Sequence, residues 1–222
     1  MITPFIPDEL FEINESPLIS FDNEYQVIYV DNFFKNYEDI TNVLHNTSVE
    51  RWKTAENTRN FIDYYDCRMV INNPYPSRDL INRKINFYYS LISNYLKETN
   101  PLEFKQGYHF NYFKNKKYNL DSKYQHYPHK DLAYNIIHYM DSFSNGGTAI
   151  YKDINIENRE EYNLFYDTSN LKIKKIIEAK PNRCVIFKGN VLHGGYINNH
   201  NIYCDNWRIN LVNFVTEVSN GR

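Results

Sequence analysis

The sequence predicts a mainly β protein, in which an antiparallel two-sheet sandwich or barrel is flanked by helices. From Glu103 onward, short β-like runs alternate with turn-forming clusters, and no long helical pattern lies between them. Many short strands without intervening helices are typical of antiparallel sandwiches and barrels. The first half instead carries helical patterns. We therefore expect a single domain over residues 1–222, with a jelly-roll core at 103–222 and supporting strands and helices at 1–102.

The N-terminal region is expected to supply an arm, a strand and a helix. Residues 1–24 carry scattered apolar and acidic side chains and are predicted to lie as an arm over the domain. Gln26–Val30 is apolar and β-branched, which predicts a strand. A helix should begin after Asn36 as N-cap, because acidic residues follow in the first turn. Its expected inward-facing residues are Ile40, Val43 and Leu44.

A further strand and the clearest helix of the sequence follow. Residues 61–71 are rich in aromatic and β-branched side chains and predict a strand. Pro76–Ser77 then opens a helix whose apolar stripe keeps helical spacing until Asn100–Pro101 stops it. The stripe consists of Ile81, Ile85, Tyr88, Ile92 and Leu96.

The second half is expected to contain the strands of the jelly roll, joined by turns. A polar segment without a clear period, Asp153–Leu171, is predicted to be a mobile lid or insertion. The predicted strands are Phe104–Phe113, Leu132–Met140, Thr148–Tyr151, Lys172–Glu178, Cys184–Phe187 and Trp207–Val215.

The composition favours a soluble domain and argues against several classes of partner. Hydrophobic residues make up 42% and aromatic residues 17% of the 222 positions, so a core can form without disulfides. The net charge of −2 does not indicate a general nucleic-acid or membrane binder. Cys67, Cys184 and Cys204 show no CxxC spacing and are expected to be reduced thiols in a cytoplasmic protein. No stretch is long and apolar enough to predict a membrane span.

The segment Tyr127–Asp131, Tyr-Pro-His-Lys-Asp, carries the first candidate metal ligands. Side chains alternate along an extended strand, so His129 and Asp131 should point to the same face. Pro128 suits the first residue of such a strand, because its backbone nitrogen has no hydrogen to donate. By itself a His-x-Asp spacing is weak evidence, and a loop histidine bonded to a nearby carboxylate is the alternative.

His193, in the segment Val191–Gly195, is the best candidate for a third ligand. Two His and one carboxylate on one face of a metal form the triad of non-haem Fe(II) oxygenases and leave other positions open. Arg208 and Asn210 are expected to share one face of the last strand, where a guanidinium can bind a carboxylate through two parallel hydrogen bonds. Taken singly, His193 can be a turn histidine and Arg208 a surface ion-pair partner.

The remaining polar features are expected to play lesser parts. The Gly146–Gly147 turn should bring Thr148 and Tyr151 back beside the site. A zinc hydrolase built on His126 and His129 is disfavoured, because the proline between them prevents helical spacing. One basic stretch is expected to be a solvated strand face, with a binding patch as the alternative: Lys172, Lys174, Lys175, Lys180 and Arg183. The histidines expected to be structural or exposed are His45, His109, His126, His138 and His200.

In order, the chain presents His129-Lys-Asp131, Asn145-Gly-Gly-Thr148, Val185–Gly189, His193 and Arg208-Ile-Asn210. This order resembles the Fe(II)/2-oxoglutarate-dependent dioxygenases, in particular their prolyl-4-hydroxylase-like branch, over roughly the second half of the chain. The resemblance implies that His129, Asp131 and His193 bind Fe(II). It also implies that Arg208 binds the distal carboxylate of 2-oxoglutarate.

The chain departs from the family pattern ahead of the His-x-Asp motif, where relatives usually carry a Tyr and a Gly at fixed positions. Tyr112 and Tyr124 are the candidates for that Tyr and for its contact with 2-oxoglutarate. Asn210 is a further candidate partner of the same carboxylate. Lys114–Tyr124 reads as an added polar turn, which leaves the choice between the two Tyr residues open.

The implied activity is hydroxylation of a C–H bond in an amino-acid, peptidyl or small-molecule substrate. O₂ is the expected co-substrate, and 2-oxoglutarate is decarboxylated to succinate. The alternative is a jelly roll that keeps a metal without turnover, as a binding or structural module. Consumption of 2-oxoglutarate distinguishes the two hypotheses.

Overall fold

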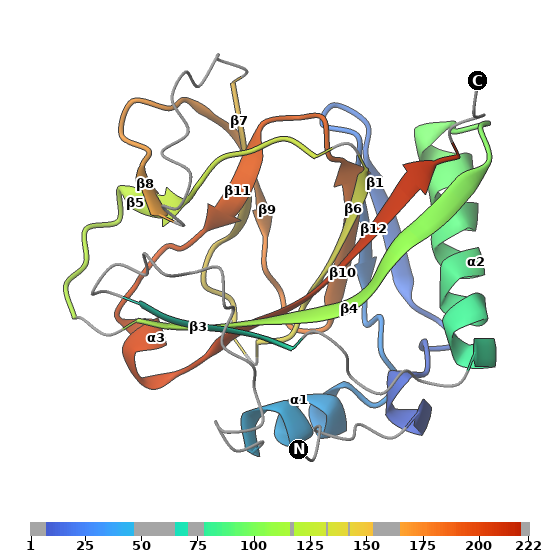
Figure 1. Cartoon of the computed structure of the whole chain (residues 1–222), viewed down its shortest axis with the longest axis horizontal. Coiled ribbons are helices and arrows are strands. Elements are labelled where there is room, and N and C mark those ends of the chain that lie inside the picture. Colours follow the sequence, from blue (N-terminus) through green and yellow to red (C-terminus); the bar gives the residue numbers. More distant parts are fainter. Residues whose placement is uncertain are drawn as a thin grey trace.

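The structure is a computed structural model that describes residues 8–46, 65–70, 78–115, 118–131, 133–141, 143–152 and 165–218. Within this part of the chain, two antiparallel sheets pack face to face, and helix α2 (Arg78–Leu96) covers the outer side of the larger sheet (Figure 1). The sequence-based prediction of an antiparallel β fold with flanking helices is confirmed.

The major sheet has the described strand order β1-β2-β10-β6-β12-β4-β3, and every neighbouring pair is antiparallel. Its strands are β1 (Leu18–Asp22), β2 (Val27–Asp31), β10 (Arg183–Lys188), β6 (Tyr134–Tyr139), β12 (Arg208–Glu217), β4 (Leu102–Asn115) and β3 (Tyr65–Val70). The minor sheet, ordered β11-β7-β9, consists of β11 (His193–Tyr196), β7 (Gly147–Tyr151) and β9 (Ile173–Glu178). A separate pair, β5 (Tyr124–His126) with β8 (Phe165–Asp167), contacts β11 through β5.

The helices begin and end where local chemistry favours it. A short 3₁₀ turn, η1 (Asp8–Phe11), precedes α1 (Tyr37–Asn46), and α3 (Ile202–Asp205) follows β11. The amide of Ile40 donates to the carbonyl of Asn36, where α1 was predicted to begin. Helix α2 ends at Leu96, the last residue of the predicted apolar stripe, because Lys97 adopts a left-handed φ of 57° that cannot continue the helix. No described helix is long and apolar enough to cross a membrane.

The alternation of side chains along β6 separates two cores. Ile136 packs with the buried stripe of α2 on the helix side of the major sheet, and His138 on the same face bonds Tyr88 of α2 at 2.9 Å. Ile137 and Tyr139 face the opposite way, into the space between the sheets. The inner core also contains Ile150, Ile177, Val185 and Phe187. Polar residues on the inner face of β6 and β12 are therefore placed inside the sandwich.

The differences from the predicted elements have simple causes. The six strands predicted in the second half are present with shifted ends, but β1 was expected to belong to an arm, and β5, β8 and β11 were not predicted. Strand β11, His-Gly-Gly-Tyr, lacks β-branched residues, so its sequence does not indicate a strand. Strands β5 and β8 are too short to show a sequence pattern, and they form by pairing with each other. The first half adds three strands to the major sheet. Residues 153–164 of the predicted lid, and 61–64 and 71 of a predicted strand, lie outside the described residues.

Candidate metal centre

His129 and His193 lie opposite each other on neighbouring backbone segments. They exchange two hydrogen bonds, 2.8 Å from the His129 amide to the His193 carbonyl and 3.0 Å in the reverse direction. Residues paired in this way direct their side chains to the same face of a sheet. The imidazole centroids are accordingly 4.6 Å apart. The strand expected around His129 is reduced to this single bridge, because β5 ends at His126.

Asp131 joins the two histidines from the loop that leads into β6. Its backbone amide donates to the Gly189 carbonyl at 2.7 Å, which holds the loop against the end of β10. Its Oδ2 lies 3.3 Å from His193 Nε2 and 3.7 Å from His129 Nε2. Among the His, Cys, Asp and Glu residues of the described segments, these three form a group whose ligand atoms lie within 4.8 Å of one another. The structure thus brings the three predicted ligands together.

Both histidines are held in the tautomer that a metal ligand requires. Nδ1 of His129 lies 2.9 Å from the Tyr127 carbonyl, and Nδ1 of His193 lies 2.8 Å from the Val191 carbonyl. A carbonyl oxygen only accepts, so each Nδ1 carries a hydrogen, and Nε2 is the ring nitrogen that can bind a metal. Both Nε2 atoms face Asp131. The site therefore offers two imidazole nitrogens and one carboxylate as metal ligands.

Asn135 on β6 also belongs to this cluster, although the sequence does not predict it. Its Nδ2 lies 3.0 Å from Asp131 Oδ2 and 2.8 Å from His193 Nε2. Burial by itself would raise the pKa of Asp131, but His193 and the Asn135 amide hold that pKa below its ordinary value. The sequence signal is weak, because Asn135 stands in a strand that is buried on both faces.

The cluster is closed at His193 and open at His129. The His193 side chain is 4% exposed, whereas that of His129 is 44% exposed. The ring of Phe187 packs edge-on against His193, with centroids 5.1 Å apart. Solvent and small molecules therefore have access to the cluster from the side of His129.

Arg208, at the start of β12, is buried between the sheets. Its Nη2 donates to the Gly147 carbonyl at 3.1 Å. With the Asn210 amide turned so that its oxygen faces the guanidinium, Nη1 donates to that oxygen at 2.9 Å. Among the described residues, Arg208 forms no ion pair with a carboxylate. A buried guanidinium bonded only to neutral oxygens is a ready site for an anion.

Tyr139 and Thr148 place two hydroxyl groups near this guanidinium. The Tyr139 hydroxyl lies 2.9 Å from Thr148 Oγ1, and Tyr139 is the register partner of Asn210. Burial raises the pKa of Tyr139 to about 12, with Arg208 acting in the opposite direction, so the phenol stays protonated. Sequence reasoning missed Tyr139, although it shares one face of β6 with Asn135. That shared face links the anion pocket, defined here as Arg208, Asn210, Tyr139 and Thr148, to the metal ligands.

The turn that leads into Thr148 requires its two glycines. Gly146 and Gly147 have φ values of 95° and 149°. A Cβ on Gly147 would lie 1.9 Å from the Ile177 carbonyl oxygen, which no side chain can accommodate. Thr148 joins the anion pocket, but Tyr151 packs with Ala149 and Leu192 in a different cluster. The expectation for Tyr151 was wrong, because residues three apart in a strand face opposite sides.

Asp141 lies just beyond β6, close enough to Arg208 for their charges to interact. Burial raises the pKa of Asp141 to about 6, and Arg208 acts against that rise. Its two carboxylate oxygens accept from the Ile209 amide at 2.6 Å and from the Tyr203 hydroxyl at 3.0 Å. Among the described residues, Asp141 bonds Ile209 and Tyr203 and forms no ion pair with Arg208.

The two predicted Tyr contacts have different outcomes. Tyr112 is the register partner of Ile209, and its side chain lies outside the described part. Tyr124 is half-buried on β5, with the Lys123 ammonium 5.2 Å from its ring centroid. No described contact joins Tyr124 to Arg208 or Asn210. Neither Tyr is placed in the anion pocket by the described structure.

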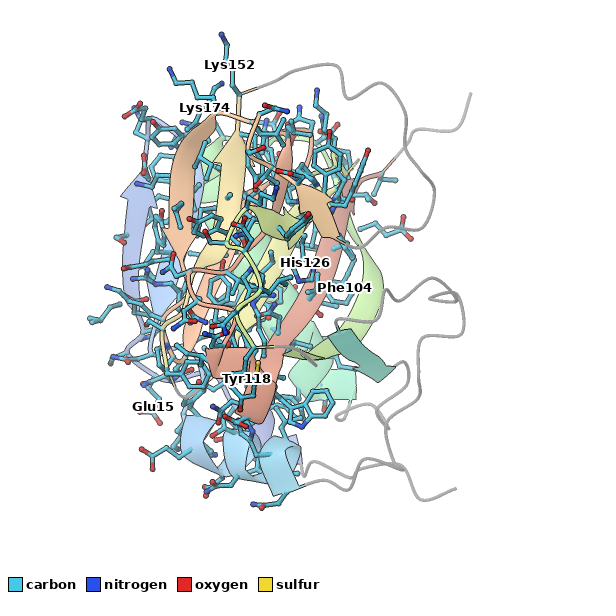
Figure 2. All side chains as sticks on the ribbon, turned by 90° about the vertical axis from the view of Figure 1, so that its left-hand side faces the viewer. Glu15, Phe104, Tyr118, His126, Lys152 and Lys174 are labelled. Atoms are coloured by element: carbon cyan, nitrogen blue, oxygen red, sulfur yellow. The ribbon has the colours of Figure 1, made fainter. Side chains whose placement is uncertain are left out.

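The basic stretch is largely neutralised rather than free. Lys175 pairs with Asp22 at 2.9 Å, and Arg183 donates to Asp31 at 2.8 Å. Figure 2 shows Lys174 and Lys152 pointing away from the molecule at one end, whereas His126 lies among the strands. Burial holds the pKa of His126 well below its ordinary value, so this ring is neutral. Cys184 and Cys204 are free thiols, as expected, and the Cys67 and His109 side chains lie outside the described part.

Comparison with known proteins identifies no family by sequence. No family model matches the chain, and no curated protein matches it. Solved structures do match. AviO1 from Streptomyces viridochromogenes Tue57 is 14% identical with a TM-score of 0.43, covering 68% of this chain and 65% of that one. The non-haem α-ketoglutarate-dependent epimerase SnoN from nogalamycin biosynthesis is 12% identical with a TM-score of 0.43, covering 69% and 62%.

A Pseudomonas putida prolyl-4-hydroxylase is 11% identical with a TM-score of 0.39, covering 76% of this chain and 78% of that one. The matched region spans slightly less than two thirds of AviO1 and SnoN. Matches at these levels carry no argument about activity. The case for a function therefore rests on the geometry of the site.

Proposed function

We propose that this protein is an Fe(II)- and 2-oxoglutarate-dependent oxygenase. The observation that carries the proposal is the combination of two sites inside one sandwich. His129, Asp131 and His193 converge as metal ligands, and Arg208 lies buried without a carboxylate partner among the described residues. A metal-binding module needs the first site, but only an enzyme with an anionic cosubstrate needs both.

The donor set fits Fe(II). Two neutral imidazole nitrogens and one carboxylate on one side of a cation form the facial triad of non-haem iron oxygenases, with other positions open. The hydrogen bonds from Nδ1 to backbone carbonyls fix both rings, as is usual for metal-bound histidines. The same donor types also bind Zn²⁺. The buried anion pocket is what favours the oxygenase over a zinc hydrolase.

The anion pocket fits one end of a dicarboxylate. The guanidinium of Arg208 supplies paired donors, and the protonated phenol of Tyr139 and the Thr148 hydroxyl can add hydrogen bonds. Because Asn135 and Tyr139 lie on the same face of β6, the metal ligands and the pocket line one interior surface. This supports 2-oxoglutarate, whose second carboxylate would bind the pocket while its keto-acid end reaches the metal.

Each residue then has a definite part. When bound, Fe(II) and 2-oxoglutarate supply the activation of O₂, with 2-oxoglutarate converted to succinate and CO₂. His129, Asp131 and His193 hold the metal, and Arg208 orients the cosubstrate by its far end. Phe187 and the surrounding inner core exclude water from the His193 side. The substrate, which we propose to be an amino-acid, peptidyl or other small C–H compound, approaches beside the exposed His129.

The test is titration of 2-oxoglutarate into anaerobic, Fe(II)-loaded protein, wild type against Arg208→Ala, by calorimetry. Loss of the paired, charge-assisted bonds should weaken 2-oxoglutarate binding by about a hundredfold or more, while the Fe(II) affinity stays unchanged. Slow succinate release in air, without added substrate, should accompany binding in the wild type. Equal 2-oxoglutarate affinities in the two proteins would contradict the proposal. Metal binding without any 2-oxoglutarate binding would favour the non-catalytic module.

A further inference from the structure

We propose that Asn135 is a positioning residue of the metal centre, which aligns Asp131 and His193 before a cation binds. This inference rests on the metal-binding part of the proposed function. The Asn135 amide nitrogen lies 3.0 Å from Asp131 Oδ2 and 2.8 Å from His193 Nε2. It thus contacts the ligand atoms of two of the three candidate ligands.

The contacts of Asn135 hold Asp131 and His193 in one arrangement. Nδ1 of His193 lies 2.8 Å from the Val191 carbonyl, which fixes one side of the ring, and Asn135 contacts the ligand atom Nε2 on the other side. The same amide nitrogen contacts Asp131 Oδ2, which lies 3.3 Å from that Nε2. Because an amide nitrogen carries two N–H groups, one side chain can reach both ligands and keep them in place.

The surroundings of Asn135 indicate that its amide serves this contact and not the core. Its register partners on both sides are aromatic, Phe187 on β10 and Phe214 on β12. The residue is 2% exposed, and its Oδ1 has no hydrogen-bond partner among the described residues. An amide that were there only for packing could be replaced by an apolar side chain, which would remove the unsatisfied oxygen. A positioning role explains why a buried amide lies next to the two ligands.

The contact with Asp131 can persist when a cation binds. A cation held by His193 Nε2 would displace the contact of that nitrogen with the Asn135 amide, whereas the amide would still orient the Asp131 carboxylate, as outer hydrogen bonds do at metal sites.

The experiment compares Asn135→Leu and Asn135→Ala with the wild type, using Co(II) alone as the probe. Leu keeps most of the volume but has no donor, whereas Ala loses both. If Asn135 positions the ligands, both variants should bind Co(II) about tenfold to hundredfold more weakly. Their Co(II) absorption spectra should also shift, because the carboxylate is no longer held in one orientation. A residue that mattered only for packing would affect the Ala variant alone and leave the spectrum of the Leu variant unchanged.

Asn213 provides the matched control. It is a buried Asn on the adjacent strand β12, paired in register with Ile136, and it lies outside both sites. Asn213→Ala and Asn213→Leu should alter thermal unfolding without changing the Co(II) affinity or spectrum. A Co(II) affinity of Asn135→Leu within about twofold of wild type, with the same spectrum, would overturn the inference. Failure of the wild type to bind Co(II) or Fe(II) would instead contradict the proposed function.

Discussion

Nε2 of His193 lies 3.3 Å from Oδ2 of Asp131, and Nε2 of His129 lies 3.7 Å from the same oxygen. The backbone makes this approach possible, because His129 pairs with His193 and the Asp131 amide is bonded to Gly189. Two segments of the chain, one with His129 and Asp131 and one with His193, therefore bring their ligand atoms to one place. A cation at this place would be held by all three ligands.

Substitution of any one ligand should abolish tight metal binding. Removal of a ligand costs more than removal of a residue that only supports one, so Fe(II) affinity should fall by more than about a hundredfold in His129→Ala, Asp131→Ala and His193→Ala. The fold should survive. Circular dichroism and thermal unfolding of the metal-free proteins check this, because both report the sandwich rather than the site. His45→Ala, on α1, is the control and should bind Fe(II) as the wild type does. If His193→Ala retains wild-type affinity, another residue is the third ligand.

Arg208→Lys should separate charge from geometry at the anion pocket. Lysine keeps the positive charge but loses the planar fork that bonds both oxygens of a carboxylate. We expect the 2-oxoglutarate affinity to fall by about tenfold to a hundredfold, as for loss of one charge-assisted hydrogen bond. Arg183→Lys is the matched control, because Arg183 is also a buried arginine but forms an ion pair with Asp31. An Arg208→Lys protein with unchanged 2-oxoglutarate affinity would show that the fork is not used.

Gly147→Ala should destabilise the minor sheet and disturb the anion pocket together. The new Cβ would lie 1.9 Å from the Ile177 carbonyl oxygen, so the pairing of β7 with β9 must shift. We expect a loss of about 3 kcal/mol or more in the free energy of unfolding, measured by urea denaturation. The exposed Ser144→Ala, in the same loop, should change stability by less than about 0.5 kcal/mol. Wild-type stability of Gly147→Ala would mean that the turn has a different conformation.

Asp141 should make stability depend on pH in an unusual direction. Burial raises its pKa to about 6 in the folded protein, against an ordinary value of 3.8, so the folded state holds its proton more tightly than the unfolded chain. The contribution is fully present below about pH 4 and is lost as the pH rises to about 6. The loss corresponds to about 3 kcal/mol.

Asp141→Asn removes this titration. Urea denaturation of both proteins at a series of pH values should therefore show the wild type losing about 3 kcal/mol relative to the variant between pH 4 and 6. Groups that titrate in both proteins cancel in the difference. A difference that stays constant over this range would show that Asp141 has an ordinary pKa in the folded state.

The sequence by itself determined the fold class and the order of the site residues. The short apolar runs predicted antiparallel strands, and the stripe ending at Leu96 predicted α2, because these patterns depend only on the local period of side-chain direction. The adjacency of His129 and Asp131 was likewise local, since residues two apart in extended backbone share a face.

Only the tertiary structure decided which distant residues complete the site. Asn135 and Tyr139 lie in a strand that is buried on both faces, so no local pattern shows that one face meets His193 and the other the helix. That choice depends on the register between strands that are far apart in sequence, and on the packing of α2 against one side of the sheet. The structure likewise places Tyr151 in a different cluster from the anion pocket. Local period fixes which side chains share a face, but long-range hydrogen bonding decides what that face meets.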